Sequence, residues 1–181
     1  MMNPWYSGDF LRTYTTDACP KQNDWMEVNK QDKLAQEIVN HPDFVDAIAK
    51  VNVALKTSGL TFFDLYKFID NAYCMIYLGR NPNPIFSPTS EIRRALDFIN
   101  TVDGYIKLFY NEAQLSAIST GYFNETVHNF KKVIADKSGV QWSFYSAHDT
   151  TLMGFLSRFG LTSARCIYEN YLNGTYYNNQ T

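Results

Sequence analysis

Apolar residues recur every three or four positions along most of the chain between residues 33 and 134, and this period is the strongest constraint on its fold. Such a period places one side of an α-helix against a core. We therefore expect a helical middle of the chain. The clearest series has alternating steps of three and four and comprises Ile92, Leu96, Ile99, Val102, Ile106 and Phe109.

We expect two helices between residues 20 and 59. The first covers residues 33–40, and the His41-Pro42 step separates it from the second, because a residue before proline avoids helical backbone. Ser58-Gly59 is expected to end the second helix. The expected buried side of this second helix comprises Phe44, Ile48, Val51 and Leu55.

Two cap signals follow. Thr61 and Asp64 have the spacing of a capping box, in which a hydroxyl group and a carboxylate satisfy free backbone N–H groups at a helix start. Ser87-Pro88 has the order of a helix cap and a first helical residue. We therefore expect the long helix that contains residues 92–109 to begin there.

A glycine is expected to divide the end of the helical middle. A shorter helix near residues 112–120 would stop at Gly121, and another helix would begin near Asn124. The expected buried side of that last helix comprises Val127, Phe130 and Ile134.

The apolar period changes towards the C-terminal end. Residues 140–145 alternate between apolar and polar side chains, which is typical of a β-strand. A tight loop follows, and then a helix over residues 152–159. Residues 168–172 have the pattern of a second strand, and Asn173-Gly174 is a strong hairpin signal that would pair it with residues 175–177. The chain as a whole predicts an α/β fold, most of it helical.

Length and charge exclude several classes of protein. The 181 residues suffice for one domain by their number. The 16 basic and 18 acidic side chains give a net charge of −2, so no basic field is available for a nucleic acid backbone. No apolar run approaches the roughly 18 residues of a membrane-spanning helix. The first residues also lack the pattern of a signal peptide.

Two other features are typical of exported proteins. The chain has three N-glycosylation sequons, at Asn124, Asn173 and Asn179. It also has three cysteines, Cys19, Cys74 and Cys166, an odd number that allows one disulfide bond within the chain. Chance sequons in an Asn-rich chain, and three thiols in a cytosolic protein, are the alternative interpretation.

His148 and Asp149 lie where a predicted strand turns into a predicted helix. Ligands of open α/β sheets gather at such places, and the first amides of the helix favour an anion. A protonated His148 would donate to a phosphate oxygen, and a carboxyl group at Asp149 would serve as a general acid. The alternative is structural, since Asp149 before Thr150 and Thr151 is also a good helix cap and His148 an ordinary loop residue.

The eight residues Tyr145-Ser146-Ala147-His148-Asp149-Thr150-Thr151-Leu152 resemble the His-Asp motif of the histidine acid phosphatases. This family is the larger branch of the histidine phosphatase superfamily. Weaker agreement is seen at Ala18-Cys19-Pro20, at Ala72-Tyr73-Cys74, and at Ala164-Arg165-Cys166 followed by Tyr168-Glu169-Asn170-Tyr171.

The resemblance implies hydrolysis of phosphate monoesters at acidic pH through a phosphohistidine intermediate. Asp149 would protonate the leaving oxygen and His148 would bind the phosphate group. The implied fold is α/β, with a phosphoglycerate-mutase-like core that is only partly present here. Residues 1–19 would be a remnant of that core, residues 20–137 a helical insertion, and residues 138–181 the C-terminal part of the core. No cofactor and no metal is implied.

One part of the family pattern is missing. The nucleophile of the family lies in an Arg-His-Gly motif, and this sequence has no Arg-His pair. His41 and His128 are expected to be surface or satisfied residues. We therefore expect the chain to lack the first part of the core and to be inactive, or nearly so, as a phosphatase on its own.

The same resemblance implies a disulfide bond between Cys74 and Cys166, with the partner of Cys19 outside this chain. It also implies that the full-length protein is secreted or lysosomal, with a small phosphomonoester as its substrate, and it leaves a homodimer open. Two other functions are considered: a non-catalytic relative that binds phosphate, and a helical module that binds a protein partner through exposed aromatic residues.

Overall fold

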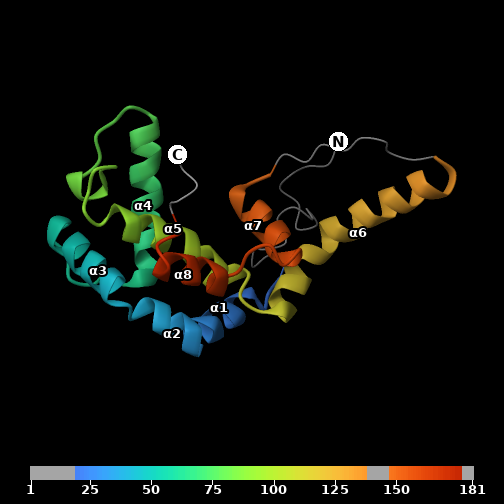
Figure 1. Ribbon diagram of the computed structural model, residues 1–181, viewed down its shortest axis with the longest axis horizontal. Helices are drawn as coiled ribbons and strands as arrows, with labels where there is room; N and C mark the ends of the chain where they lie inside the picture. Colours follow the sequence, from blue (N-terminus) through green and yellow to red (C-terminus); the bar gives the residue numbers. More distant parts are fainter. Residues whose placement is uncertain (1–18, 138–146, 177–181) are drawn as a thin grey trace. The chain divides into compact units, whose positions relative to one another are not determined.

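The computed structural model describes residues 19–137 and 147–176, and every regular element within these residues is a helix (Figure 1). The mostly helical character predicted from the apolar period is confirmed. The strand predicted at residues 140–145 lies outside the described residues.

Three helices, and not the two expected, precede residue 59: α1 (Gln22–Lys30), α2 (Lys33–Val39) and α3 (Pro42–Ala54). The apolar period does not indicate α1, because the buried side of this helix is polar. Asn29 donates to the carbonyl of Ile106 at 3.0 Å, and Gln22 to that of Lys107 at 3.3 Å. These carbonyls belong to the last turn of α5 (Arg93–Leu108), where no helical partner exists for them.

The capping box of α4 (Phe62–Tyr77) is confirmed, since the Asp64 carboxylate accepts from the backbone N–H of Thr61 at 2.9 Å. The predicted helix start at Ser87-Pro88 is wrong. Asn83 caps a short 3-10 helix, η2 (Pro84–Phe86), by accepting from the Ile85 N–H at 3.1 Å. The order of a cap residue followed by proline therefore marks a helix start four residues earlier, at Asn83-Pro84. The long helix α5 begins only at Arg93.

The predicted break at Gly121 is also wrong, because α6 runs without interruption from Glu112 to Asp136. A glycine costs a helix only about 1 kcal/mol, so a single one does not end it. Val127, Phe130 and Ile134, which were expected to be buried, are 44%, 63% and 83% exposed. They share one side of α6, as their spacing requires, but no described residue covers them.

The helix expected over residues 152–159 is present as α7 (Asp149–Arg158). The strand predicted at residues 168–172 is wrong, since α8 (Ala164–Leu172) occupies this segment. Asn173-Gly174 ends α8 instead of turning a hairpin: Gly174 has a φ of +71°, and Thr175 donates to the carbonyl of Asn170 at 3.0 Å. Hairpin turns and helix C-termini both require left-handed backbone, so the sequence signal is the same for both.

The turn after α3 also requires left-handed backbone, but here the residue is a lysine and not a glycine. Lys56 has a φ of +53°, and Thr57 donates to the carbonyl of Asn52 at 2.9 Å. The predicted stop at Ser58-Gly59 is therefore a few residues late.

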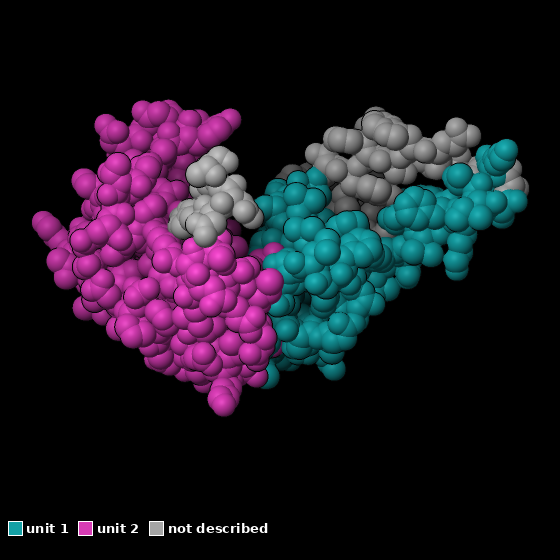
Figure 2. Space-filling model, viewed as in Figure 1, with its two compact units in different colours: residues 1–28, 107–163 teal, residues 29–106, 164–181 magenta. Residues whose placement is uncertain are grey.

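The chain divides into two compact units, coloured separately in Figure 2. One unit comprises residues 1–28 and 107–163, and contains α6 and α7. The other comprises residues 29–106 and 164–181, and contains α2 to α5 and α8.

The core of the second unit surrounds α5. The series Ile92, Leu96, Ile99, Val102 and Ile106 is buried as predicted. The ring of Phe98 stacks on that of Phe44 from α3 with centroids 4.6 Å apart. Tyr171 of α8 packs on both rings, and its hydroxyl group donates to Asp43 at 2.8 Å. Arg94 donates to the carbonyl of Tyr171 near the end of α8.

Tyrosines that are partly or wholly buried join the helices of this unit by hydrogen bonds. Tyr73 of α4 donates to the Asp97 carboxylate, which also accepts from Arg93 at 2.8 Å. Burial, and then the hydrogen bond to Asp97, raise the pKa of Tyr73 above its ordinary value of 10.0. Burial and the hydrogen bond to Asp43 raise the pKa of Tyr171 in the same way.

We predict that Lys56→Gly stabilises the protein by about 0.5 to 1 kcal/mol. The left-handed conformation costs a residue with a side chain roughly 1 to 2 kcal/mol, and the extra entropy of glycine in the unfolded chain offsets about half of that. Urea denaturation measures the difference. Lys67→Gly, the same change at an exposed position within α4, is the control and should destabilise by about 1 kcal/mol. Equal effects of the two changes would contradict the left-handed cap.

We predict that the free energy of unfolding falls as the pH rises above about 10. Below that pH, Tyr73 and Tyr171 are protonated in both states and their contribution is complete. Above it, the unfolded chain releases these protons first, because the folded pKa values are raised. Denaturation from pH 8 to 11, as approximate limits, should show a shallower fall in Tyr73→Phe and Tyr171→Phe. Tyr77→Phe is the control because that side chain is 91% exposed; an equal change there would contradict the prediction.

Candidate functional site

His148 and Asp149 lie together at the N-terminus of α7, as the motif predicts. His148 is the residue before the helix, with extended backbone (φ −80°, ψ 165°), and its carbonyl accepts from the Thr151 N–H at 3.1 Å. Asp149 is the first helical residue, and its carboxylate accepts from the Thr150 N–H at 2.7 Å. The helix cap predicted at Asp149 is thus one residue earlier, at His148.

The surroundings of this pair are open to solvent. Both side chains are exposed, and within the described residues neither forms an ion pair. A carboxylate in the first turn is stabilised by the positive end of the helix. The pair can therefore contact a ligand from solvent, with a carboxyl group and an imidazole as the reactive groups.

The apolar side of α7 is also exposed. The helix buries its small residues, Gly154 and Ser157, within its own unit. Asp149 lies one turn before Leu152, so the carboxyl group is at the N-terminal end of the apolar side. The exposed apolar residues are Leu152 (61%), Phe155 (37%), Leu156 (41%) and Phe159 (56%).

Contacts with α6 hold α7 in this orientation. The ring of Phe155 stacks on that of Phe123, with centroids 5.4 Å apart and an angle of 15°. Arg158, in the last turn of α7, forms an ion pair with Glu112 and donates to Ser116 at 3.0 Å. The N-terminus of α7 therefore has a defined position within its unit.

The two cysteines of the predicted bridge lie in the same unit. Cys74 of α4 and Cys166 of α8 are both exposed, and Cys166 accepts from the Asn170 side chain at 3.8 Å. No disulfide bond is formed among the residues that the structure describes, so the Cys74–Cys166 bond stays a prediction.

Two of the three sequon asparagines are accessible. Asn173 is exposed in the turn after α8, and Asn124 is exposed on α6. Asn179 lies outside the described residues.

The other two histidines have separate surroundings. His41 caps α3 by accepting from the Asp43 N–H at 3.3 Å, and its ring contacts Phe44 and Tyr171. It is a satisfied residue, as expected. His128 is exposed on α6.

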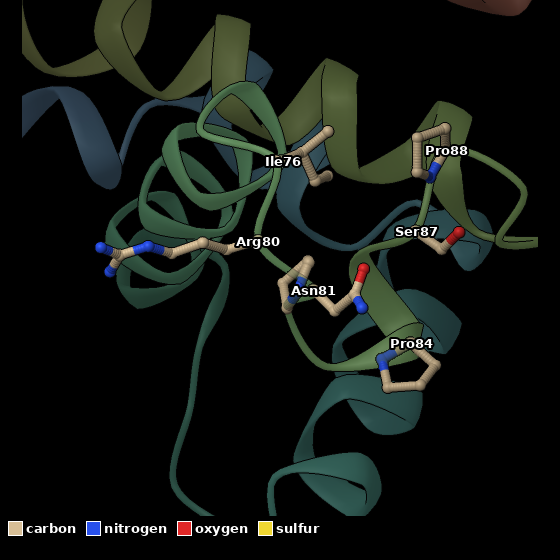
Figure 3. Close-up of a pocket in the computed structure, with 8 residues that line it drawn as sticks. Ile76, Arg80, Asn81, Pro84, Ser87 and Pro88 are labelled. Atoms are coloured by element: carbon tan, nitrogen blue, oxygen red, sulfur yellow. The ribbon is translucent and has the colours of Figure 1, made fainter.

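A cavity of about 530 Å³ lies between the end of α4 and η2, in the second unit (Figure 3). The apolar period predicts no helix for residues 79–88, which supply most of the lining. The three prolines that line the cavity, Pro82, Pro84 and Pro88, are the signal that could have indicated rigid walls.

Neither a metal centre nor a membrane-spanning helix is found within residues 19–137 and 147–176. No group of three or more His, Cys, Asp or Glu side chains there could hold a metal ion. None of the helices in these ranges is long and apolar enough to cross a membrane.

Comparison with known proteins gives no further guide. No protein-family model, no curated protein and no solved structure matches this chain. The resemblance to the histidine acid phosphatases therefore depends on the residues of the motif itself.

We predict that Gly154→Ala destabilises the protein by about 1 kcal/mol, although helix propensity alone favours alanine by about the same amount. A Cβ atom at this position would lie 2.8 Å from Cε1 of Phe109, so the side of α7 that is now buried has no room for it. Gly59→Ala is the control, since nothing lies within 4 Å of a Cβ atom there. Thermal unfolding measures both, and a stabilising Gly154→Ala would show that α7 does not bury this side.

Proposed function

We propose that this chain contributes the His-Asp part of a histidine acid phosphatase site. The observation that carries the proposal is the eight-residue motif from Tyr145 to Leu152. The exposure of His148 and Asp149 at the start of α7 supports it, because both side chains can reach a ligand. In this proposal the described helices belong to an α/β protein with a phosphoglycerate-mutase-like core, and residues 20–137 are its helical insertion.

Each residue has a separate role in the proposed reaction, which is the hydrolysis of a phosphate monoester. His148 in its charged form donates a hydrogen bond to a phosphate oxygen. Asp149 in its protonated form gives its proton to the leaving oxygen, so the ester C–O–P link breaks at phosphorus and an alcohol is released. The phosphoryl group is transferred to a histidine nucleophile, and water then hydrolyses this phosphohistidine and releases inorganic phosphate. This chain does not supply the nucleophile, because it has no Arg-His pair.

The chain alone is therefore a phosphate-binding part and a very poor catalyst. A non-catalytic relative of the phosphatases would also bind phosphate without turnover. The missing Arg-His pair supports such a relative as well as it supports an incomplete phosphatase site. We propose that the protein is a secreted or lysosomal glycoprotein, and the exposure of the sequon residues Asn124 and Asn173 supports this.

We predict weak, local binding of inorganic phosphate to the purified chain at pH about 5, with a Kd in the range of about 1 to 10 mM. NMR spectra of the ¹⁵N-labelled chain should show shifts at the amides of Asp149, Thr150 and Thr151. His148→Ala should weaken binding at least about threefold, because a charge-assisted hydrogen bond is lost. Asp149→Asn should strengthen binding at pH about 7, because it removes a carboxylate that repels phosphate.

His128→Ala is the matched control, since that histidine is exposed on α6. The hydrolysis of p-nitrophenyl phosphate should stay at the background rate throughout. Shifts that are absent, or that survive unchanged in His148→Ala, would contradict the phosphate site. Turnover that is lost in His148→Ala would support the site and contradict the proposed inactivity of the chain.

A further inference from the structure

The cavity at the end of α4 has the size of a binding site. Its volume of about 530 Å³ lies within the range of about 300 to 1,000 Å³ that is usual for ligand sites. Figure 3 shows the side chains of Ile76, Asn81, Pro84 and Pro88 around it, whereas the side chain of Arg80 extends to the other side of the chain.

The walls of this cavity are fixed before any ligand arrives. Gly79 ends α4 in the left-handed conformation, with a φ of +69°, and Arg80 donates to the carbonyl of Met75 at 2.8 Å. On the other wall, Asn83 donates to the carbonyl of Ala54 at 3.3 Å and Phe86 is only 3% exposed. A preformed site loses little conformational entropy on binding.

The lining combines apolar rings with one amide. Ile76 and the prolines present aliphatic surface that suits an aromatic ring. The Asn81 amide is exposed beside them and has no hydrogen bond within the described part of the chain. An amide side chain both donates and accepts, so it matches the N–H and C=O of a peptide group.

The loop that lines the cavity carries one charged side chain, and that charge is positive. Arg80 is the single charged side chain between residues 76 and 90, and within the described residues it has no ion pair. Because it extends away from the cavity, its partner would be a neighbouring part of the ligand and not the group inside. Tyr77 and Leu78, immediately before the cavity loop, are 91% and 65% exposed and extend the apolar surface.

We propose that this cavity binds an acidic peptide segment of another protein. One aromatic side chain of that segment occupies the space between Ile76 and the prolines, and its peptide group pairs with Asn81. A carboxylate in an adjacent residue pairs with Arg80. The proposal does not depend on the phosphatase function, because the cavity belongs to a different unit from His148 and Asp149.

Two dipeptides with opposite charges on their second side chain test the proposal on the full chain: N-acetyl-Trp-Glu-amide and N-acetyl-Trp-Lys-amide. In NMR titrations, both should shift the amides of Gly79, Asn81 and Ser87. The Glu peptide should bind about threefold more tightly, as expected for one exposed ion pair. Arg80→Gln should remove this difference and retain binding, and Asn81→Ala should weaken both peptides.

Lys67→Gln is the control, since it removes an exposed positive charge from α4 within the same unit. It should leave the preference for the Glu peptide unchanged. Shifts that do not cluster at the cavity would overturn the proposal, and so would equal affinities of the two dipeptides for the unaltered chain. Both outcomes are measured on the unaltered chain, so the proposal can be overturned even if a variant fails to fold.

Discussion

The packing of rings around Phe98 is the interaction on which the second unit depends. Phe98 lies in the middle of α5, is fully buried, and stacks on Phe44 with an interplanar angle of 3°. Tyr171 joins α8 to the same cluster, so helices that are far apart in sequence are held by one set of contacts. Loss of a buried aromatic side chain of this kind costs about 3 to 5 kcal/mol, which is a large part of the stability of a small domain.

The sequence predicted α5, whose buried side is apolar, and missed α1, whose buried side is polar. The α5 series could be read directly, since every third or fourth residue is apolar and buried. For α1 the buried residues are Gln22 and Asn29, which enter the core because they bond carbonyls at the end of α5. For α8 the hairpin prediction is wrong because its signal is ambiguous: Gly174 supplies the left-handed backbone that both a hairpin and a helix end need.

The candidate site could be predicted only in part for a similar reason. The motif located His148 and Asp149 at a helix start, since that depends on local sequence alone. Which side of α7 is buried depends on its neighbours, and hydrophobicity predicts the wrong side. Gly154 fits against Phe109 because it has no side chain, and the ring pair of Phe123 and Phe155 fixes the rotation of the helix. Leu152 and Leu156 consequently face solvent, whereas the ring of Phe155 packs on α6.

This orientation connects the proposed chemistry to the exposed side of α7. A general acid must hold a proton near the working pH, and removal of water favours the protonated form of a carboxyl group. Asp149 stands one turn before Leu152, so a polypeptide surface that covered the apolar side of α7 would also remove water from this carboxyl group. Within the proposed function, covering the apolar side of α7 and making Asp149 an acid are therefore one requirement.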